Sequence, residues 1–108
     1  MTVVQLECFL AVTRTRHFGR AAEDLGRKQP ALSVQVQRLE AALGAALFEH
    51  TTRHVRLTTA GETLVPYAER ILADVDESRT KIQDVRGGNL GVVRIGVLPT
   101  VAATSFWS

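Results

Sequence analysis

The spacing of apolar residues predicts several helices in the first half of the chain. Residues 3–15 carry two apolar stripes that together cover most of a helix, so we expect this helix to be buried on two sides. Two shorter helices follow. The apolar positions of the first are Phe18, Ala21, Ala22 and Leu25. Those of the second are Leu32, Val36, Leu39 and Leu43. Gly26 suits the left-handed end of the first of these helices, and Pro30 suits the start of the second.

Two helices joined by a short turn with a glycine are typical of a DNA-binding helix-turn-helix. At 100° per residue, the apolar stripe of the second helix lies within about 40° of Leu32. The opposite side is polar or small and has no acid in its first two turns; it holds Pro30, Val34, Gln37, Arg38 and Ala41, with Ala31 and Ser33 at its flanks. Gln and Arg can pair with purine edges, and methyl groups can contact thymine. An ordinary amphipathic helix with a solvated face is the alternative for this helix taken alone.

Residues 47–58 change in character and favour two short strands. Phe48 and the alternating residues 54–58 suit the strands, and Thr51, Thr52 and Arg53 lie near the tip between them. A hairpin after a recognition helix is a wing, and the minor groove attracts arginine. We therefore expect Arg53 to enter a minor groove; the alternative is an exposed loop charge.

Residues 59–86 predict one long helix that pairs with a second copy. Thr59 and Glu62 fit a capping box at its start. Its apolar residues alternate at spacings of four and three, a heptad seam that Ser78 interrupts once. The seam consists of Leu64, Ala68, Ile71, Val75, Ile82 and Val85. A core helix of one monomer is the alternative, but only the helix at 3–15 is available to cover the seam.

The chain thus divides into three parts. Residues 1–58 form the DNA-binding domain and residues 59–87 form the linker or dimerisation helix. A glycine-rich break at 87–91 precedes an apolar strand at 92–98, of the kind found in parallel sheets buried on both faces. We interpret residues 88–108 as the truncated start of a further domain. The predicted fold is mainly α, with a small β-hairpin wing.

Composition and charge narrow the function. The chain has 108 residues and a formal charge of only +2, but eight basic and four acidic residues lie between Arg14 and Arg56. A basic segment around a recognition helix is the expected electrostatic footprint of a DNA-binding protein. The single cysteine, Cys8, suits a reducing cytoplasm and is interpreted as a packed hydrophobe. The chain has no apolar run of membrane-spanning length.

No residue pattern indicates catalysis. His50 and His54 have a spacing seen in metal sites, but no cysteine or acidic pair accompanies them. The sequence has no nucleophile beside a base and no phosphate-binding glycine loop. We therefore expect no enzyme, no cofactor and no metal.

Together these residues resemble the N-terminus of a LysR-type transcriptional regulator, over about residues 3–104. The resemblance rests on Leu6-Glu-Cys-Phe-Leu-Ala-Val, Phe18 with Arg20-Ala-Ala, Gln29-Pro-Ala-Leu-Ser, Arg38-Leu-Glu, Leu43-Gly, Leu47-Phe-Glu, Thr52-Arg, Val55-Arg-Leu-Thr, Ala60-Gly-Glu and Gly91-Val-Val-Arg-Ile-Gly. It implies a winged helix-turn-helix, a linker helix that pairs in a dimer, and a two-lobed effector domain that senses a small molecule. It also implies sequence-specific DNA binding and control of transcription.

Residue by residue, the resemblance implies a DNA contact surface of Lys28, Gln29, Pro30, Ala31, Ser33, Val34, Gln37 and Arg38, with Arg53 in the minor groove. Three positions depart from the family pattern. Lys28 stands at a usual serine, which removes a helix cap and adds a cation. Gly19 replaces a usual threonine, so a hydroxyl-to-phosphate bond is absent. Val34 occupies a position that is often arginine, which weakens a polar base contact or replaces it with a methyl contact.

The expected partners are double-stranded DNA and a second copy of the chain, as a homodimer or as a tetramer. A small-molecule effector is expected only where the full effector domain is present. The alternative function is an interaction protein that heterodimerises with a full-length regulator through the linker helix and thereby modulates it.

Overall fold

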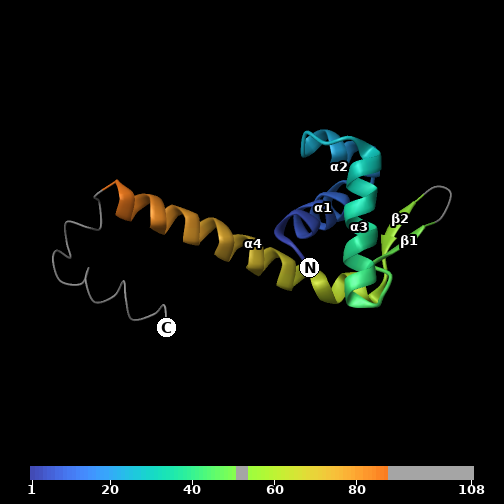
Figure 1. The fold of residues 1–108 in the computed structure, drawn as a ribbon. Helices are drawn as coiled ribbons and strands as arrows, with labels where there is room; N and C mark the ends of the chain where they lie inside the picture. The colour runs from blue at the N-terminus through green and yellow to red at the C-terminus, as the bar shows by residue number, and fades with distance from the viewer. Residues whose placement is uncertain (51–53, 88–108) are drawn as a thin grey trace. The chain divides into compact units, whose positions relative to one another are not determined.

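The computed structural model describes residues 1–50 and 54–87. Figure 1 shows the order of the elements: α1 (Val3–Thr15), α2 (Phe18–Asp24), α3 (Gln29–Leu43), β1 (Phe48–His50), β2 (Val55–Leu57) and α4 (Thr59–Arg86). The two strands pair antiparallel, with Glu49 opposite Arg56. The mainly helical fold with a small hairpin, predicted from the sequence, is confirmed.

The helix α1 forms the centre of the core. Thr2 caps it by a capping box with Gln5, in which each side chain accepts a hydrogen bond from the other residue's backbone N–H at 3.1 Å. Side chains from both predicted stripes are buried: Leu6, Cys8, Phe9, Leu10, Ala11 and Val12. The expected burial on two sides is therefore confirmed, and it makes α1 the common support for α2 and α3, both of which it contacts.

The turn between α2 and α3 follows the glycine signal. Gly26 adopts φ +65°, a left-handed conformation that glycine takes without steric cost. The N–H of Arg27 closes the turn by donating to the carbonyl of Ala22 at 2.8 Å. Pro30 is the second residue of α3, in the first turn, where proline sacrifices no intrahelical hydrogen bond. The two helices pack against each other and against α1.

The apolar stripe of α3 ends one turn earlier than the sequence pattern predicts. Leu32, Val36 and Leu39 are buried, but Leu43 is 42% exposed. Leu43 is the last residue of the helix, and the chain leaves it through Gly44 in a left-handed conformation at φ +68°. The residue therefore lies at the edge of the core.

The start of α4 differs from the predicted capping box at Thr59. The capping hydroxyl belongs to Thr58, which accepts from the N–H of Gly61 at 3.0 Å and donates to the carbonyl of Ala46 at 2.6 Å. Thr59 is already inside the helix. Thr58 is favoured because one hydroxyl caps the helix and also ties it to the segment that precedes β1.

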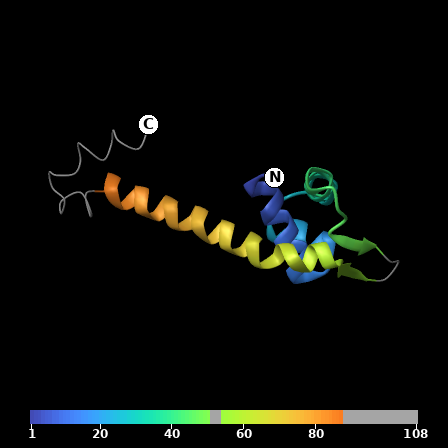
Figure 2. The same cartoon turned by 90° about the horizontal axis from the view of Figure 1, so that it is seen from below.

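The first turns of α4 pack on the core of their own chain (Figure 1 and Figure 2). Ala68 is fully buried there, and Leu64 and Ile71 are half-buried against the same cluster. The sequence pattern had assigned all three to a seam covered by a second copy. Ala68 corrects that expectation, because its side chain leaves no surface for a partner.

The chain divides into two compact units. The first comprises Met1–Leu72, and the second begins at Ala73. Among residues 1–50 and 54–87, no helix is both long and apolar enough to cross a membrane. The predicted strand at 92–98 and the predicted wing tip with Arg53 lie outside the described residues.

Candidate nucleic-acid interface

One side of α3 is exposed along the whole helix. The residues on this side are Pro30, Ala31, Val34, Gln37, Arg38 and Ala41, and Ser33 beside them is half-buried. Because Leu32, Val36 and Leu39 hold the opposite side in the core, this orientation of α3 is fixed by burial. The exposed side contains no carboxylate, and Arg38 is its charged group. An edge of this composition can approach a polyanion and can offer both hydrogen bonds and methyl groups.

The beginning of α3 leaves its backbone donors available. Lys28 occupies the N-cap position, and its side chain makes no capping hydrogen bond. The first-turn N–H groups of a helix attract anions when no side chain caps them, and the ammonium group of Lys28 adds a positive charge beside them. The sequence predicted that α3 lacks a side-chain cap because lysine stands at position 28, and the structure confirms this.

Gly19 leaves room for two neighbouring side chains. A Cβ atom at this position would lie 3.0 Å from Cε1 of His17 and 3.4 Å from Oε1 of Gln29. His17 itself caps α2, because its Nδ1 accepts a hydrogen bond from the N–H of Arg20 at 3.0 Å. A Cβ atom at 19 would therefore crowd His17, the cap of α2, while its separation from Gln29 would be that of an ordinary contact.

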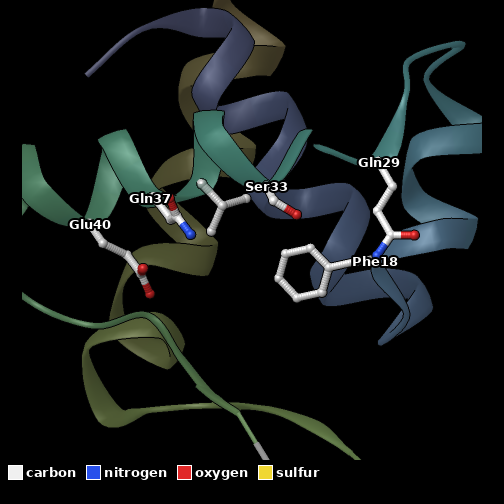
Figure 3. Close-up of a pocket in the computed structure, with 6 residues that line it drawn as sticks. Phe18, Gln29, Ser33, Gln37 and Glu40 are labelled. Atoms are coloured by element: carbon white, nitrogen blue, oxygen red, sulfur yellow. The ribbon is translucent and has the colours of Figure 1, made fainter. Parts of the chain in front are cut away.

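A pocket of about 240 Å³ runs along the flank of α3 and is lined by Phe18, Gln29, Ser33, Val36, Gln37 and Glu40. Figure 3 shows the ring of Phe18 and the side chains of Ser33 and Gln37 around the same hollow, while Glu40 lies further along the helix. The amide and hydroxyl groups of this lining can donate hydrogen bonds to phosphate oxygens.

Glu40 positions the first strand of the hairpin relative to α3. Its carboxylate accepts hydrogen bonds from the backbone N–H of Leu47 at 2.7 Å and of Phe48 at 3.4 Å. Phe48 in turn packs its ring against Phe9 of α1 and Phe18 of α2, with centroid distances of 5.5 and 6.0 Å. The base of the hairpin is therefore held by both a charged hydrogen bond and aromatic packing.

Exposed basic side chains are frequent in this part of the chain. Those among the described residues between Arg14 and Arg56 are Arg14, Arg16, Arg20, Arg27, Lys28, Arg38 and Arg56. Exposed acids are also present, at Glu23, Asp24 and Glu49. The acids lie on α2 and in the hairpin, so the exposed side of α3 itself stays free of negative side chains.

The predicted seam on α4 falls into two classes. Leu64, Ala68 and Ile71 belong to the first unit and pack against its core. Val75 is half-buried, whereas Ile82 is 61% and Val85 54% exposed. These last two have the apolar surface that a partner could cover.

Sequence reasoning did not single out Glu40 or His17 as residues that position the site. A signal existed only for His17, which immediately precedes the apolar pattern of α2, where capping residues stand. The hydrogen bonds of Glu40 join residues seven and eight positions apart, and no local pattern predicts them.

The three packed helices, the exposed side of α3 and the antiparallel hairpin that follows define a winged helix-turn-helix module. Residues 3–62 match the model of the "Bacterial regulatory helix-turn-helix protein, lysR family". The chain belongs to this family.

Relatives with assigned functions agree with that membership. The chain is 44% identical over 100 residues to the HTH-type transcriptional regulator IlvR of Caulobacter vibrioides, covering 93% of this chain and 34% of the relative. It is 44% identical over 101 residues to a probable hydrogen peroxide-inducible genes activator of Streptomyces viridosporus, covering 94% and 32%. The chain thus spans about a third of the length of these relatives.

Solved structures also match at the level of the fold. The crystal structure of a BenM_DBD/benA site 1 DNA complex has a TM-score of 0.75 and 35% identity, covering 82% of this chain and 99% of that one. The CbnR_DBD–DNA complex has the same TM-score and identity, covering 80% and 99%. Both of these similar chains were solved with DNA.

Proposed function

We propose that the chain binds double-stranded DNA sequence-specifically, as a dimer, and thereby regulates transcription. The observation that carries this proposal is the exposed, carboxylate-free side of α3, with uncapped first-turn amides at its beginning. Its similarity to two DNA-bound structures supports the same function.

The proposal gives each part of the surface a role. α3 enters the major groove, where Gln29, Gln37 and Arg38 read base edges or phosphates. Lys28 and the first-turn amides bind a backbone phosphate. Pro30, Ala31, Ser33 and Val34 approach the groove closely because their side chains are short. Arg53 of the wing enters the adjacent minor groove.

We further propose that α4 holds two copies together. Ile82 and Val85 are apolar and largely exposed in the single chain, and Val75 continues the same seam. Full burial of an exposed Val or Ile side chain contributes about 1.5–3 kcal/mol, and these partly exposed side chains contribute correspondingly less. Leu64 and Ile71 contribute only the smaller part of their surface that the core leaves free, and Ala68 contributes none.

The remaining assignments follow from the family. We assign the chain to the cytoplasm, as a DNA-binding regulator without a catalytic step of its own. Dimers could assemble further into a tetramer, and a small-molecule effector would act only through a complete effector domain. No specific observation favours the alternative of a heterodimerising modulator.

Selection from a pool of random-sequence duplexes tests the function. The chain should enrich a two-part site, with the two halves related by the symmetry of the dimer, and the affinity should fall steeply with salt because cationic groups displace counterions from phosphates. A pool that stays random after repeated rounds at low salt would contradict the proposal.

A further inference from the structure

Val34 is the large exposed hydrophobic residue of the DNA-facing side of α3, with 40% of its surface accessible. It lies one turn beyond Pro30 and Ala31 and one turn before Gln37 and Arg38, all of which are exposed. At 100° per residue it projects about 200° from Leu32, opposite the buried stripe. Val34 therefore stands in the middle of the surface that the proposed function turns toward the duplex.

The chemistry of valine restricts what it can recognise there. Its side chain has no hydrogen-bond donor or acceptor, so it gains nothing from the nitrogen and oxygen atoms of base edges. In the major groove the thymine 5-methyl group is the apolar feature that distinguishes one base pair from the others. Valine in a helix is also held in one χ1 rotamer, so its two methyl groups are already oriented before binding.

The neighbours of Val34 make the contact specific. Ala31 is small, so no long side chain from the preceding turn covers the methyl groups. Gln37 and Arg38 provide hydrogen-bonding groups on the following turn. They can form hydrogen bonds with the adjacent base pairs while Val34 contacts a methyl group.

We propose that Val34 recognises the 5-methyl group of a thymine, so that each half of the operator contains an A·T pair at the position facing residue 34. This inference rests on the proposed DNA binding and names the base that the site selects. Removal of one methyl contact should lower affinity about fourfold, given the transfer free energy of a buried methyl group and the relation of free energy to affinity.

The test replaces each thymine of the selected duplex, one at a time, with deoxyuridine, which lacks only the methyl group. Binding is measured by competition for the full chain and for Val34→Ala. The full chain should lose about fourfold in affinity at one thymine per half-site. Val34→Ala should bind the unmodified duplex correspondingly more weakly, and it should not distinguish thymine from uracil at that position.

Leu43→Ala is the matched control, since Leu43 lies on the same helix with a similar exposed fraction of 42% but on the side opposite Val34. This variant should retain the full discrimination between thymine and uracil. Val34→Thr, which keeps the branched shape and one methyl group, should retain part of it.

The outcomes separate the inference from the function on which it rests. If the full chain enriches a site but tolerates uracil at every position, or if Val34→Ala discriminates as strongly as the full chain, the assignment of Val34 is wrong while DNA binding stands. If no site is enriched from the random pool, the proposed function itself fails.

Discussion

Gly61 lies directly against the segment that leads into the hairpin. A Cβ atom at this position would collide with the backbone carbonyl oxygen of Leu47 and would lie 2.7 Å from Cδ2 of Leu57. Because the first of these atoms belongs to the backbone, it cannot move aside as a flexible side chain could.

Gly61→Ala should therefore destabilise the fold, although alanine is the better helix former. Overpacking of this kind costs about 1–3 kcal/mol. Chemical denaturation of the variant should give a lower midpoint with an unchanged slope. A matched control is Thr63→Ala, at an exposed position of the same helix; equal stabilities of the two variants would contradict the clash.

Cys8 illustrates a residue whose chemistry is suppressed by its surroundings. Its side chain is fully buried, and this burial raises the pKa of the thiol above its ordinary value of 9.0; the charge of Arg27 lowers the pKa and that of Glu7 raises it. The thiol should therefore react with a disulfide reagent far more slowly in the native chain than in denaturant. Equal labelling rates in the two states would show that Cys8 is accessible.

The raised pKa also gives a pH dependence. The unfolded thiol ionises at a lower pH than the folded one, so the unfolded chain binds fewer protons in alkaline solution. The contribution of Cys8 to stability is therefore complete below pH 9 and decreases as the pH rises toward the folded pKa. Cys8→Ala should lack this alkaline loss when unfolding is followed by denaturant titration.

At the scale of elements, the hairpin depends on its attachment to the helices as well as on its own strand pairing. Two strands of three residues each form few backbone bonds, and an isolated hairpin is only marginally stable. The carboxylate of Glu40 and the ring of Phe48 supply the missing attachment.

Glu40→Ala should loosen this attachment by about 1–3 kcal/mol, because two backbone N–H groups lose a charged acceptor. Amide hydrogen exchange at Leu47 and Phe48 should accelerate, while exchange in α1 changes less. Glu40→Gln keeps a neutral acceptor in the same place, so its exchange rates at these two amides should lie between those of Glu40→Ala and the original chain. Unchanged exchange at both amides would show that the hydrogen bonds contribute little.

The helices and the turn could be predicted from sequence because their signals are local. The stripe of Leu32, Val36 and Leu39 and the left-handed Gly26 each depend on a few neighbouring residues. The cap of α4 was misassigned because Thr58 and Thr59 are adjacent and chemically equal. Only the carbonyl of Ala46, brought close by the fold, distinguishes them.

At the scale of the whole molecule, heptad spacing could not tell which chain covers α4. The same pattern contains Ala68, buried by its own core, and Ile82, which the described residues leave exposed. A periodic apolar stripe predicts that one side of a helix is buried, but it does not tell whether the same chain or a second copy buries it. The exposed side of α3 could be predicted from its apolar period, whereas its contact with DNA and the roles of its residues remain proposals.

Ile82→Asp should prevent pairing, because a charge replaces an apolar group at the centre of the proposed interface. Sedimentation velocity should report a monomer, and binding to a two-part duplex should weaken as the second half-site is lost. Thr80→Asp adds the same charge at an exposed position about 200° away around the helix and should leave the dimer intact. A dimer that persists in Ile82→Asp would exclude this part of α4 as the interface.

A single residue, Thr58, separates the end of β2 from the beginning of α4, and its hydroxyl bonds both the first turn of α4 and Ala46, which precedes β1. The connection therefore has no slack. The first turn of α4, the end of β2 and the segment before β1 are therefore joined at one residue.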